Sequence, residues 1–312
     1  MTDNRVTVSP YSADDAAVWD DIVERAANGT LLHTRRYLGY HGDRFADRSL
    51  LVLESGKPVA VVAAAVDPDD EHCVVSHPGI TYGGIVHLAS FRGAVVQDAL
   101  EACLHQWAAD RVIYKPVPHV IHRVPAQDDL WALYMAGAVR TRCDLSWAVD
   151  LSTPMAWSGN RRRAVSKALA TVQITEDQTA LPQLWDIVTQ VLADRHGVRP
   201  VHTLDEMRDL LERCPQEIRV HVARLQDRVI AGSVVYRVGA AWHSQYLASS
   251  PEGRELGALD AVVSFGIEAA RSAGARWYDF GISNVKGLLN EGLYFYKSSF
   301  GGGSVAQEHY EL

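Results

Sequence analysis

The chain has 312 residues, 47% hydrophobic and 22% charged, a composition typical of a folded protein with one large or two modest domains. Its formal net charge of -8 excludes a protein whose whole surface binds nucleic acid, although a local basic patch is compatible with it. No apolar run approaches the ~20 residues that span a bilayer, and the acidic N-terminal segment is unlike a secretory signal. Four scattered cysteines without a CxxC pair fit a reducing compartment, so we expect a cytoplasmic protein that makes no membrane contact.

The first half of the chain predicts elements in the order β-α-ββ-β-α-β. Alternating or continuous apolar runs indicate the strands, and helical spacing between a Ser/Asp start and a Gly stop indicates the first helix. Glu-Ser-Gly-Lys-Pro between two apolar runs is typical of a tight hairpin. We expect a strand at 5–10, a helix at 12–29, a hairpin at 49–66, strands at 72–78 and 82–88, a helix at 91–110 and a strand at 111–117.

The second half repeats much of this order. We expect helices at 161–170, 181–196 and 204–214, a meander at 218–249, a helix at 256–274 and a strand at 275–283. The runs LLVLESGKPVAVVAAAV and VHVARLQDRVIAGSVVYRV are each strand, polar turn and strand at the same place in their halves. This self-similarity predicts duplication of a whole domain. Pro, Ser and Gly in LSTPMAWSG place the boundary near 150–159, which gives domains 1–150 and 151–312.

Three patches carry a resemblance to a known family. The most specific is YDFGISN followed by LNEGLYFYKSSFGGG at 278–303, and the others are SGNRRRAVSKALATVQITE at 158–176 and SHPGITYGGIV at 76–86. They resemble the FemAB-like aminoacyl and acyl transferases, whose closing pattern is G-L-x-x-F-K-x-x-F-G. The resemblance implies an α/β (α+β) fold of two tandem GNAT-like domains, each a mixed, mostly antiparallel sheet flanked by helices. It also implies an acceptor side in the first domain and a catalytic donor side in the second.

Two departures from the family pattern bear on the substrates. The long coiled-coil arm of peptidoglycan-building members is replaced by two ordinary helices broken by HGVRPVH, which favours a compact acceptor. The pyrophosphate loop of GNAT enzymes has the form [QR]-x-x-G-x-[GA], and glycines there let backbone N–H groups approach phosphates. Here Arg254 and Gly257 fit this form, but Leu259 stands at the last small position. A phosphate cradle and an ordinary helix entry are both open.

Two residues are candidates for the chemistry. By resemblance, Lys297 matches the lysine that approaches the tRNA end and the reacting carbonyl, where its ammonium would stabilise an oxyanion or hold a donor phosphate. The alternative is a strand lysine that reaches solvent past aromatic neighbours. Asp279 interrupts an apolar strand, and a buried carboxylate there needs a hydrogen-bonding or ionic partner, or else has a functional role. It would take or position the proton of the acceptor amine, or else accept backbone hydrogen bonds at the strand end.

Several residues are candidates for substrate binding. Tyr82, Gly83 and Gly84 resemble the family's acceptor-side loop, with a β-bulge as the alternative. The segment TRRYLGYHGDR lies near where related enzymes hold the acceptor's anionic group, although most such arginines are simply solvated. Near the C-terminus, Asn290 orders a loop or contacts the donor, and the tyrosines exclude water around Lys297. The remaining candidates are Arg36, Tyr37, His41, Tyr294 and Tyr296.

A basic cluster is the candidate tRNA contact. Arg161, Arg162, Arg163 and Lys167 span just over one helical turn and can present part of their charge to a phosphate backbone, with Lys297 added by resemblance. The alternative is a solvent-exposed helix face, which is the usual location of a run of charged residues.

Other chemistries are not supported by the sequence. His119 and His122 form HxxH in an extended run that points them to opposite faces, so they predict no metal site. Motifs of metalloproteases, α/β-hydrolases, kinases and dehydrogenases are missing. We therefore expect an aminoacyl-tRNA-dependent transferase that forms an amide on a small peptide-like or nucleoside-like acceptor, in natural-product (antibiotic) or cell-wall-precursor synthesis. It would need no metal or other cofactor. The alternatives are an acyl-coenzyme A-dependent GNAT N-acyltransferase and a non-catalytic tandem-GNAT binding module.

Overall fold

The computed structural model describes residues 5–312, except the side chains at 195 and 196. The chain divides into two units, Met1–Leu145 with Ala306–Leu312, and Ser146–Val305. This division differs from a single cut after residue 150, because the end of the last strand, β16 (Gly303–Glu311), pairs with β7 (Arg111–Tyr114) of the first unit. Residues of the long strand β8 (Val139–Asp150) also belong to both units.

The first unit has two groups of strands. One sheet has the order β1-β2-β3-β6, with all neighbours antiparallel. Its strands are β1 (Val6–Pro10), β2 (Leu50–Glu54), β3 (Lys57–Val62) and β6 (Ile85–His87). The second group contains β4 (Ala65–Asp67), β5 (Asp70–Val75) and β7, and β5 runs parallel to β7. The predicted hairpin at 49–66 is confirmed, since Ser55 and Gly56 form its turn with positive φ.

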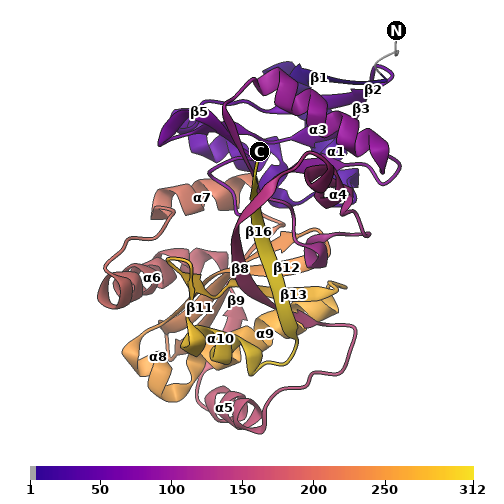
Figure 1. The fold of residues 1–312 in the computed structure, drawn as a ribbon. Coiled ribbons are helices and arrows are strands. Elements are labelled where there is room, and N and C mark those ends of the chain that lie inside the picture. The colour runs from indigo at the N-terminus through magenta and orange to yellow at the C-terminus, as the bar shows by residue number, and fades with distance from the viewer. Residues whose placement is uncertain (1–4) are drawn as a thin grey trace. The chain divides into compact units, whose positions relative to one another are not determined.

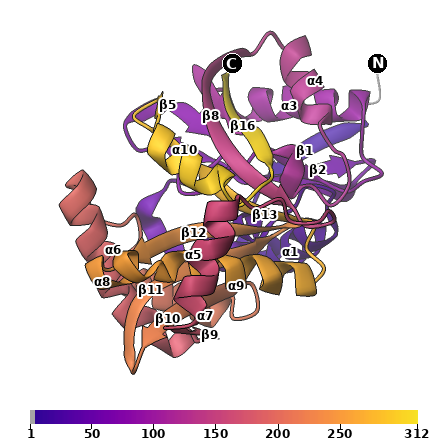
Figure 2. The ribbon, with the colours of Figure 1, turned by 90° about the horizontal axis from the view of Figure 1, so that it is seen from below.

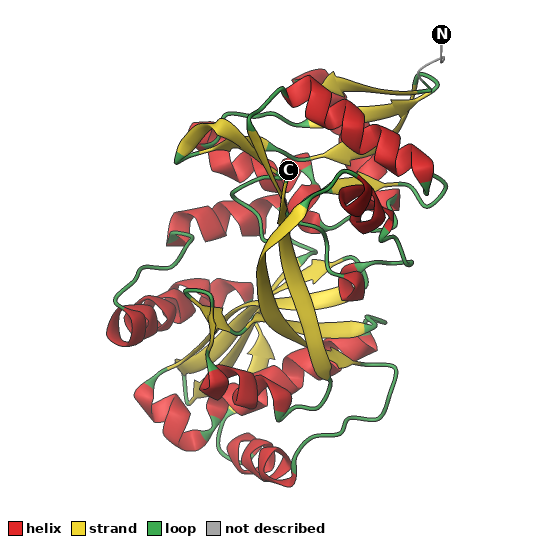
Figure 3. Cartoon of the chain, in the orientation of Figure 1, coloured by secondary structure: helices red, strands yellow, loops and turns green. Residues whose placement is uncertain are grey.

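Helices cover these strands. They are α1 (Ala16–Arg25), α2 (Arg35–Leu38), α3 (Ala94–Trp107) and α4 (Asp128–Met135), coloured red in Figure 3. Helix α3 lies across the first sheet (Figure 1). It buries Val96, Leu100, Cys103 and Trp107, one stripe at helical spacing, against a core that includes Val52 of β2.

The second unit is built on a sheet that ends in the order β8-β13-β12-β11-β10-β9. Its further strands are β9 (Gln173–Glu176), β10 (Ile218–Leu225), β11 (Arg228–Val238), β12 (Ala241–Ser249) and β13 (Trp277–Ile282). The predicted meander at 218–249 is confirmed as β10, β11 and β12, which are antiparallel neighbours. Strand β12 runs parallel to β13, whereas β13 is antiparallel to β8. A short hairpin of β14 (Asn284–Val285) and β15 (Leu288–Leu289) follows.

Six helices belong to this unit. They are α5 (Gly159–Leu169), α6 (Leu181–His196), α7 (Leu204–Arg213), α8 (Pro251–Leu256), α9 (Ala258–Ser272) and α10 (Glu291–Ser298). Helix α9 runs along β10 to β12 in Figure 2 and packs with Trp242 and Tyr278 in the core. Each unit thus combines mostly antiparallel strands with flanking helices, and the predicted α/β (α+β) fold class is confirmed.

Candidate functional site

The parallel strands β12 and β13 separate at a pair of polar residues. Their register ends at His243 opposite Asp279, although β12 continues to Ser249 and β13 to Ile282. Tyr278 packs in the core with α9, so the next residue, Asp279, points to the other face of the sheet. Ligands of open α/β sheets bind where parallel strands diverge at their carboxyl ends. This point of separation is therefore the candidate functional site.

Asp279 is buried among three hydrogen-bond donors. Its carboxylate accepts bonds from Ser146 Oγ at 2.7 Å, His243 Nδ1 at 2.6 Å and the backbone N–H of Gly281 at 3.0 Å. Burial raises the pKa of this carboxyl, but the bonds from His243, Ser146 and Gly281 outweigh it and the pKa is lowered. Of the two roles that the sequence left open, the geometry favours the buried acid that organises the strand end.

Lys297 lies in the last turn of α10, not on a strand, and its side chain reaches the end of β13. Its Nζ donates to the carbonyl oxygens of Gly281 at 2.8 Å and Ile282 at 2.6 Å. Burial lowers its pKa to about 8, against the opposing effect of the negative Asp279. The structure therefore brings the two predicted catalytic residues together around Gly281, and the alternative of a solvent-reaching strand lysine is wrong.

His243 was not among the residues that the sequence singled out. Its partner Asp279 is 36 positions away, and only the parallel pairing of β12 with β13 brings them together. Gly281 adopts a φ of 69° beside it, and a Cβ there would lie 3.0 Å from His243 Cε1. The one available signal was a polar stretch, His-Ser-Gln at 243–245, between apolar residues of the strand.

The other C-terminal candidates shape the helix that carries Lys297. Asn290 caps α10, because its side chain accepts a bond from the N–H of Leu293 at 3.0 Å. Tyr294 packs edge-on against Trp147 with ring centroids 5.1 Å apart. The Arg161 guanidinium lies 4.6 Å from the ring centroid of Tyr296. For Asn290, the loop-ordering role is the one that the contacts support.

The basic helix α5 divides into one bound arginine and an exposed group. Arg161 forms an ion pair with Asp260 of α9, donates to Ser299 Oγ at 2.9 Å and keeps only 13% of its side chain exposed. It therefore joins α5 to α9 and α10 and does not belong to the predicted phosphate-binding surface. The residues of that cluster left exposed are Arg162, Arg163 and Lys167.

The segment that resembles a pyrophosphate loop is folded into helix α8. Ser250 caps it, and Asp260, in the first turn of the following α9, is ion-paired with Arg161. A side-chain nitrogen of Arg254 donates to the Ser249 carbonyl at 3.0 Å. Backbone N–H groups that bond within this segment are those of Gly253, Arg254, Gly257, Asp260 and Ala261. Of the two interpretations of this segment, a phosphate cradle and an ordinary helix entry, the structure supports the helix entry.

The glycine loop of the first unit is closely packed. A Cβ on Gly83 would lie 2.1 Å from the Ser76 carbonyl oxygen, and one on Gly84 would lie 2.6 Å from the Tyr114 ring. Tyr82 is 1% exposed. Both glycines are therefore required by contacts within the unit, which is a sufficient reason for their presence.

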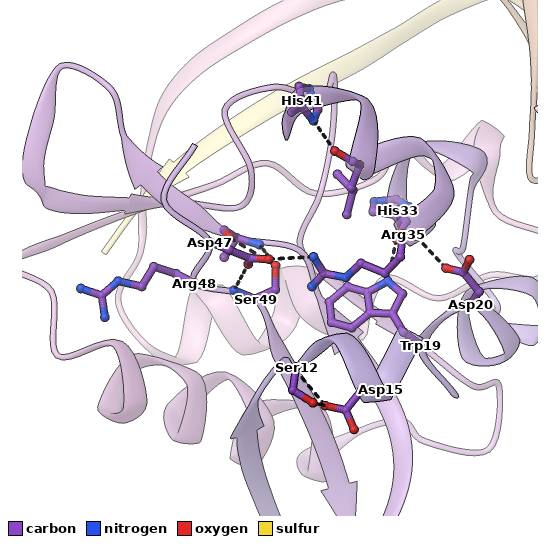
Figure 4. Close-up of polar contacts among 12 residues, drawn as sticks. Ser12, Asp15, Trp19, Asp20, His33, Arg35, His41, Asp47, Arg48 and Ser49 are labelled. Carbon is purple, nitrogen blue, oxygen red and sulfur yellow. Dashed lines mark hydrogen bonds and ion pairs between the residues drawn. The ribbon is translucent and has the colours of Figure 1, made fainter. Parts of the chain in front are cut away.

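The segment around Arg36 is ordered by its neighbour Arg35. The Arg35 guanidinium lies over the ring of Tyr11, 3.3 Å from its centroid. It also lies 3.9 Å from the ring centroid of Trp19 and donates to Asp47 at 2.8 Å (Figure 4). The side chain of Arg36 is exposed, whereas Tyr37 and His41 are buried. These three candidates therefore do not share one surface.

His41 contacts a buried lysine site that the sequence did not predict. Its ring nitrogens lie 3.0 Å from the Leu38 carbonyl and 3.1 Å from the Gly79 carbonyl, and the ring packs against His77. Lys115 Nζ donates to the carbonyls of His77 at 2.7 Å and Ile80 at 2.5 Å. Burial, with a smaller effect from the positive Arg142, lowers the pKa of Lys115 to about 7.

The described part of the chain contains neither a metal cluster nor a membrane-spanning helix. No group of three or more of its described His, Cys, Asp or Glu side chains is placed to hold a metal ion. None of the described helices combines the length and apolar character needed to cross a bilayer.

Comparison with known proteins identifies the fold. The model of the acetyltransferase (GNAT) domain family matches residues 158–298. The crystal structure of FemX superposes with a TM-score of 0.71 at 13% identity, over 97% of this chain and 96% of that one. The structure of L-PGS from Bacillus licheniformis gives 0.63 at 13% identity, over 96% and 91%. A tandem GNAT protein from the clavulanic acid biosynthesis pathway gives 0.52 at 11% identity, over 98% of both chains.

No curated protein sequence matches the chain. At these identities the solved structures establish the fold, and they extend over nearly all of the chain. The predicted resemblance is therefore confirmed at the level of architecture: the chain has the tandem GNAT fold of the FemAB-like transferases, with an acetyltransferase (GNAT) domain in its second unit.

Proposed function

We propose that the protein is an aminoacyl-tRNA-dependent transferase that forms an amide bond on the amine of a small peptide-like or nucleoside-like acceptor. The FemAB-like resemblance of the motifs at 278–303 implies a charged tRNA as donor, and the match to FemX over almost the whole chain supports it. The exposed Arg162, Arg163 and Lys167 offer a local basic surface for the tRNA acceptor arm in an otherwise acidic protein.

The observation that carries this proposal is the closed segment between β12 and α9. A coenzyme A pyrophosphate needs free backbone N–H groups, but those of Gly253, Arg254, Gly257, Asp260 and Ala261 bond within the segment. An acyl-coenzyme A donor is the alternative that this geometry disfavours.

The chemistry needs positioning and charge stabilisation. An aminoacyl ester is already activated, so attack by an amine requires no metal or redox cofactor and no covalent enzyme intermediate. An ammonium has three donors, and two of those on Lys297 bind the carbonyls of Gly281 and Ile282. The third is left for the oxyanion that forms on the ester carbonyl.

Two helices of the second unit support a compact acceptor. Helices α6 and α7, of 16 and 10 residues, stand where peptidoglycan-building relatives carry a long coiled-coil arm. This favours a compact acceptor in natural-product or cell-wall-precursor synthesis, carried out in the cytoplasm where charged tRNA is made.

The proposal is tested with total tRNA charged with one labelled amino acid at a time. Each preparation is mixed with the protein and with pools of dipeptides, aminonucleosides or nucleotide-linked peptide precursors. Mild alkali then hydrolyses the remaining ester but not an amide, so alkali-stable label in a small molecule measures transfer. Labelled acetyl-coenzyme A is run in parallel. Transfer from acetyl-coenzyme A alone would support the alternative donor, and transfer from neither would favour a binding module.

A further inference from the structure

The imidazole of His243 is held by Asp279 in one orientation. Asp279 Oδ2 lies 2.6 Å from His243 Nδ1, and the carboxylate is also bound by Ser146 and Gly281. A carboxylate can only accept, so the proton of a neutral imidazole is on Nδ1 and the lone pair is on Nε2. The ring is thus fixed as a proton acceptor.

His243 Nε2 is open at the point where the two strands separate. It makes no hydrogen bond to any described residue, and the residue is 7% exposed. A side chain on Gly281 would come within 3.0 Å of Cε1 and 3.7 Å of Nε2. The glycine therefore leaves room for a small group next to this nitrogen.

Several titratable groups surround the imidazole ring of His243. Titratable groups near it come from three elements: Asp279 on β13, Lys297 on α10, and Tyr236, which pairs with His243 from β11. Lys297 is bound to the carbonyl of Gly281, the residue that borders the ring. A base and a buried ammonium thus flank the same glycine. Ser146 is not an activated nucleophile, because its Oγ bonds to Asp279 and not to the imidazole.

We propose that His243 is the general base of the transfer reaction and that Asp279 is its positioning residue. The assignment rests on the proposed function. As the neutral acceptor amine attacks the ester carbonyl carbon, the C–N bond forms and the carbonyl electron pair moves to oxygen. His243 Nε2 takes one proton from the amine nitrogen. When the tetrahedral intermediate collapses, the bond to the ribose oxygen breaks and the imidazolium returns the proton to that oxygen, which leaves an amide and a free tRNA hydroxyl.

The test compares the wild type with His243→Gln in single-turnover transfer from charged tRNA. Glutamine fills a similar space and keeps a hydrogen bond to Asp279, but it cannot take the proton. We expect the rate to fall about 100-fold or more, in line with removal of a general base. The acidic limb of the pH–rate profile should also disappear. His105→Gln, at an exposed position on α3, is the matched control and should keep both rate and profile.

A second variant tests the assignment even if His243→Gln does not fold. Asp279→Asn keeps the size of the side chain, but its amide can donate to Nδ1 and so leave the imidazole proton on Nε2, which then cannot accept a proton. The transfer rate should therefore fall in this variant as well. Unchanged rates and profiles in folded His243→Gln overturn the base assignment. If that variant does not fold, an unchanged rate in Asp279→Asn overturns it. Absence of transfer by the wild type from every charged tRNA overturns the proposed function, and the base assignment with it.

Discussion

Lys297 Nζ lies 2.8 Å from the carbonyl oxygen of Gly281, the residue whose missing side chain leaves room for the His243 ring. One backbone position therefore receives a helix lysine on its carbonyl side and faces a histidine on its Cα side. Among the described contacts, α10 and the end of β13 meet through a charged group only here. A substitution in either element should therefore disturb the same backbone position, Gly281.

Replacement of Lys297 by methionine should slow transfer strongly without unfolding the protein. The carbonyls of Gly281 and Ile282 lose a donor, but the cost of burying an ammonium disappears as well, so we expect the free energy of unfolding to change by about 1 kcal/mol or less. The transfer rate should fall about 100-fold, as on removal of an oxyanion donor. Single-turnover rates and urea unfolding measure both, with the exposed Lys57→Met as control. A folded Lys297→Met that transfers normally would leave this lysine a structural role only.

Asn290→Ala should lower stability by about 1 kcal/mol, because the α10 N–H of Leu293 loses its cap. Asn290→Gly should cost only a few tenths of a kcal/mol, since glycine is also tolerated at this position. Urea unfolding of the three proteins checks the order. Normal stability together with lost transfer in Asn290→Ala would instead show that the side chain contacts the donor.

Removal of two exposed arginines from α5 should weaken tRNA binding and its dependence on salt. Arg162→Ala with Arg163→Ala removes up to two phosphate contacts, each of which contributes about 0.7 to 0.9 to the slope of log K against log salt. Filter binding of charged tRNA between low and moderate salt gives this slope. Arg25→Ala with Arg228→Ala, at positions 62% and 64% exposed elsewhere, makes the same change in net charge. Equal weakening by the two double variants would argue against a tRNA surface on α5.

The sequence predicted the elements whose signals are local. The hairpin at 49–66 follows from a polar turn that tolerates positive φ, and the helices of the second half follow from apolar spacing. Helix α10 was missed because Tyr, Phe and Tyr in YFYKSS are typical of strands, while the Asn290 cap and tertiary contacts decide for a helix.

Only part of the site could be predicted from the sequence, for a related reason. Asp279 could be found because it places a charge in an apolar strand, and Lys297 because the motif at 278–303 resembles that of the FemAB-like transferases. His243 could not be assigned a role without the parallel pairing of β12 and β13, which local patterns do not reveal. Arg161 was grouped with its neighbours on α5 because its ion pair with Asp260 joins residues far apart in the chain.

Acetyl-coenzyme A should leave the melting temperature unchanged. A ligand at 100 times its Kd stabilises a protein by about 2.7 kcal/mol. At about 2 to 4 °C per kcal/mol for a unit of this size, the melting temperature would rise by about 5 to 11 °C. Because the N–H groups of Gly253, Arg254, Gly257, Asp260 and Ala261 bond within the segment, we expect 1 mM acetyl-coenzyme A to give no such shift in a thermal melt. Adenosine 3′,5′-bisphosphate controls for adenine binding elsewhere. A rise of several degrees with the acyl compound alone would contradict the closed-loop interpretation.

The stability of the first unit should depend on pH through Lys115. Burial lowers its folded-state pKa from 10.5 to about 7, so between pH 7 and about 10.5 the unfolded chain binds more protons than the folded one. The free energy of unfolding therefore gains a contribution that rises with pH across this window, by at most about 1.4 kcal/mol per pH unit. Lys115→Met lacks this contribution. Urea unfolding at pH 7, 8, 9 and 10 should show the difference between wild type and Lys115→Met moving steadily in favour of the wild type. Lys57→Met, which removes an exposed positive charge of the same unit, is the control, and a constant offset for Lys115→Met would show that this ammonium stays charged in the folded protein.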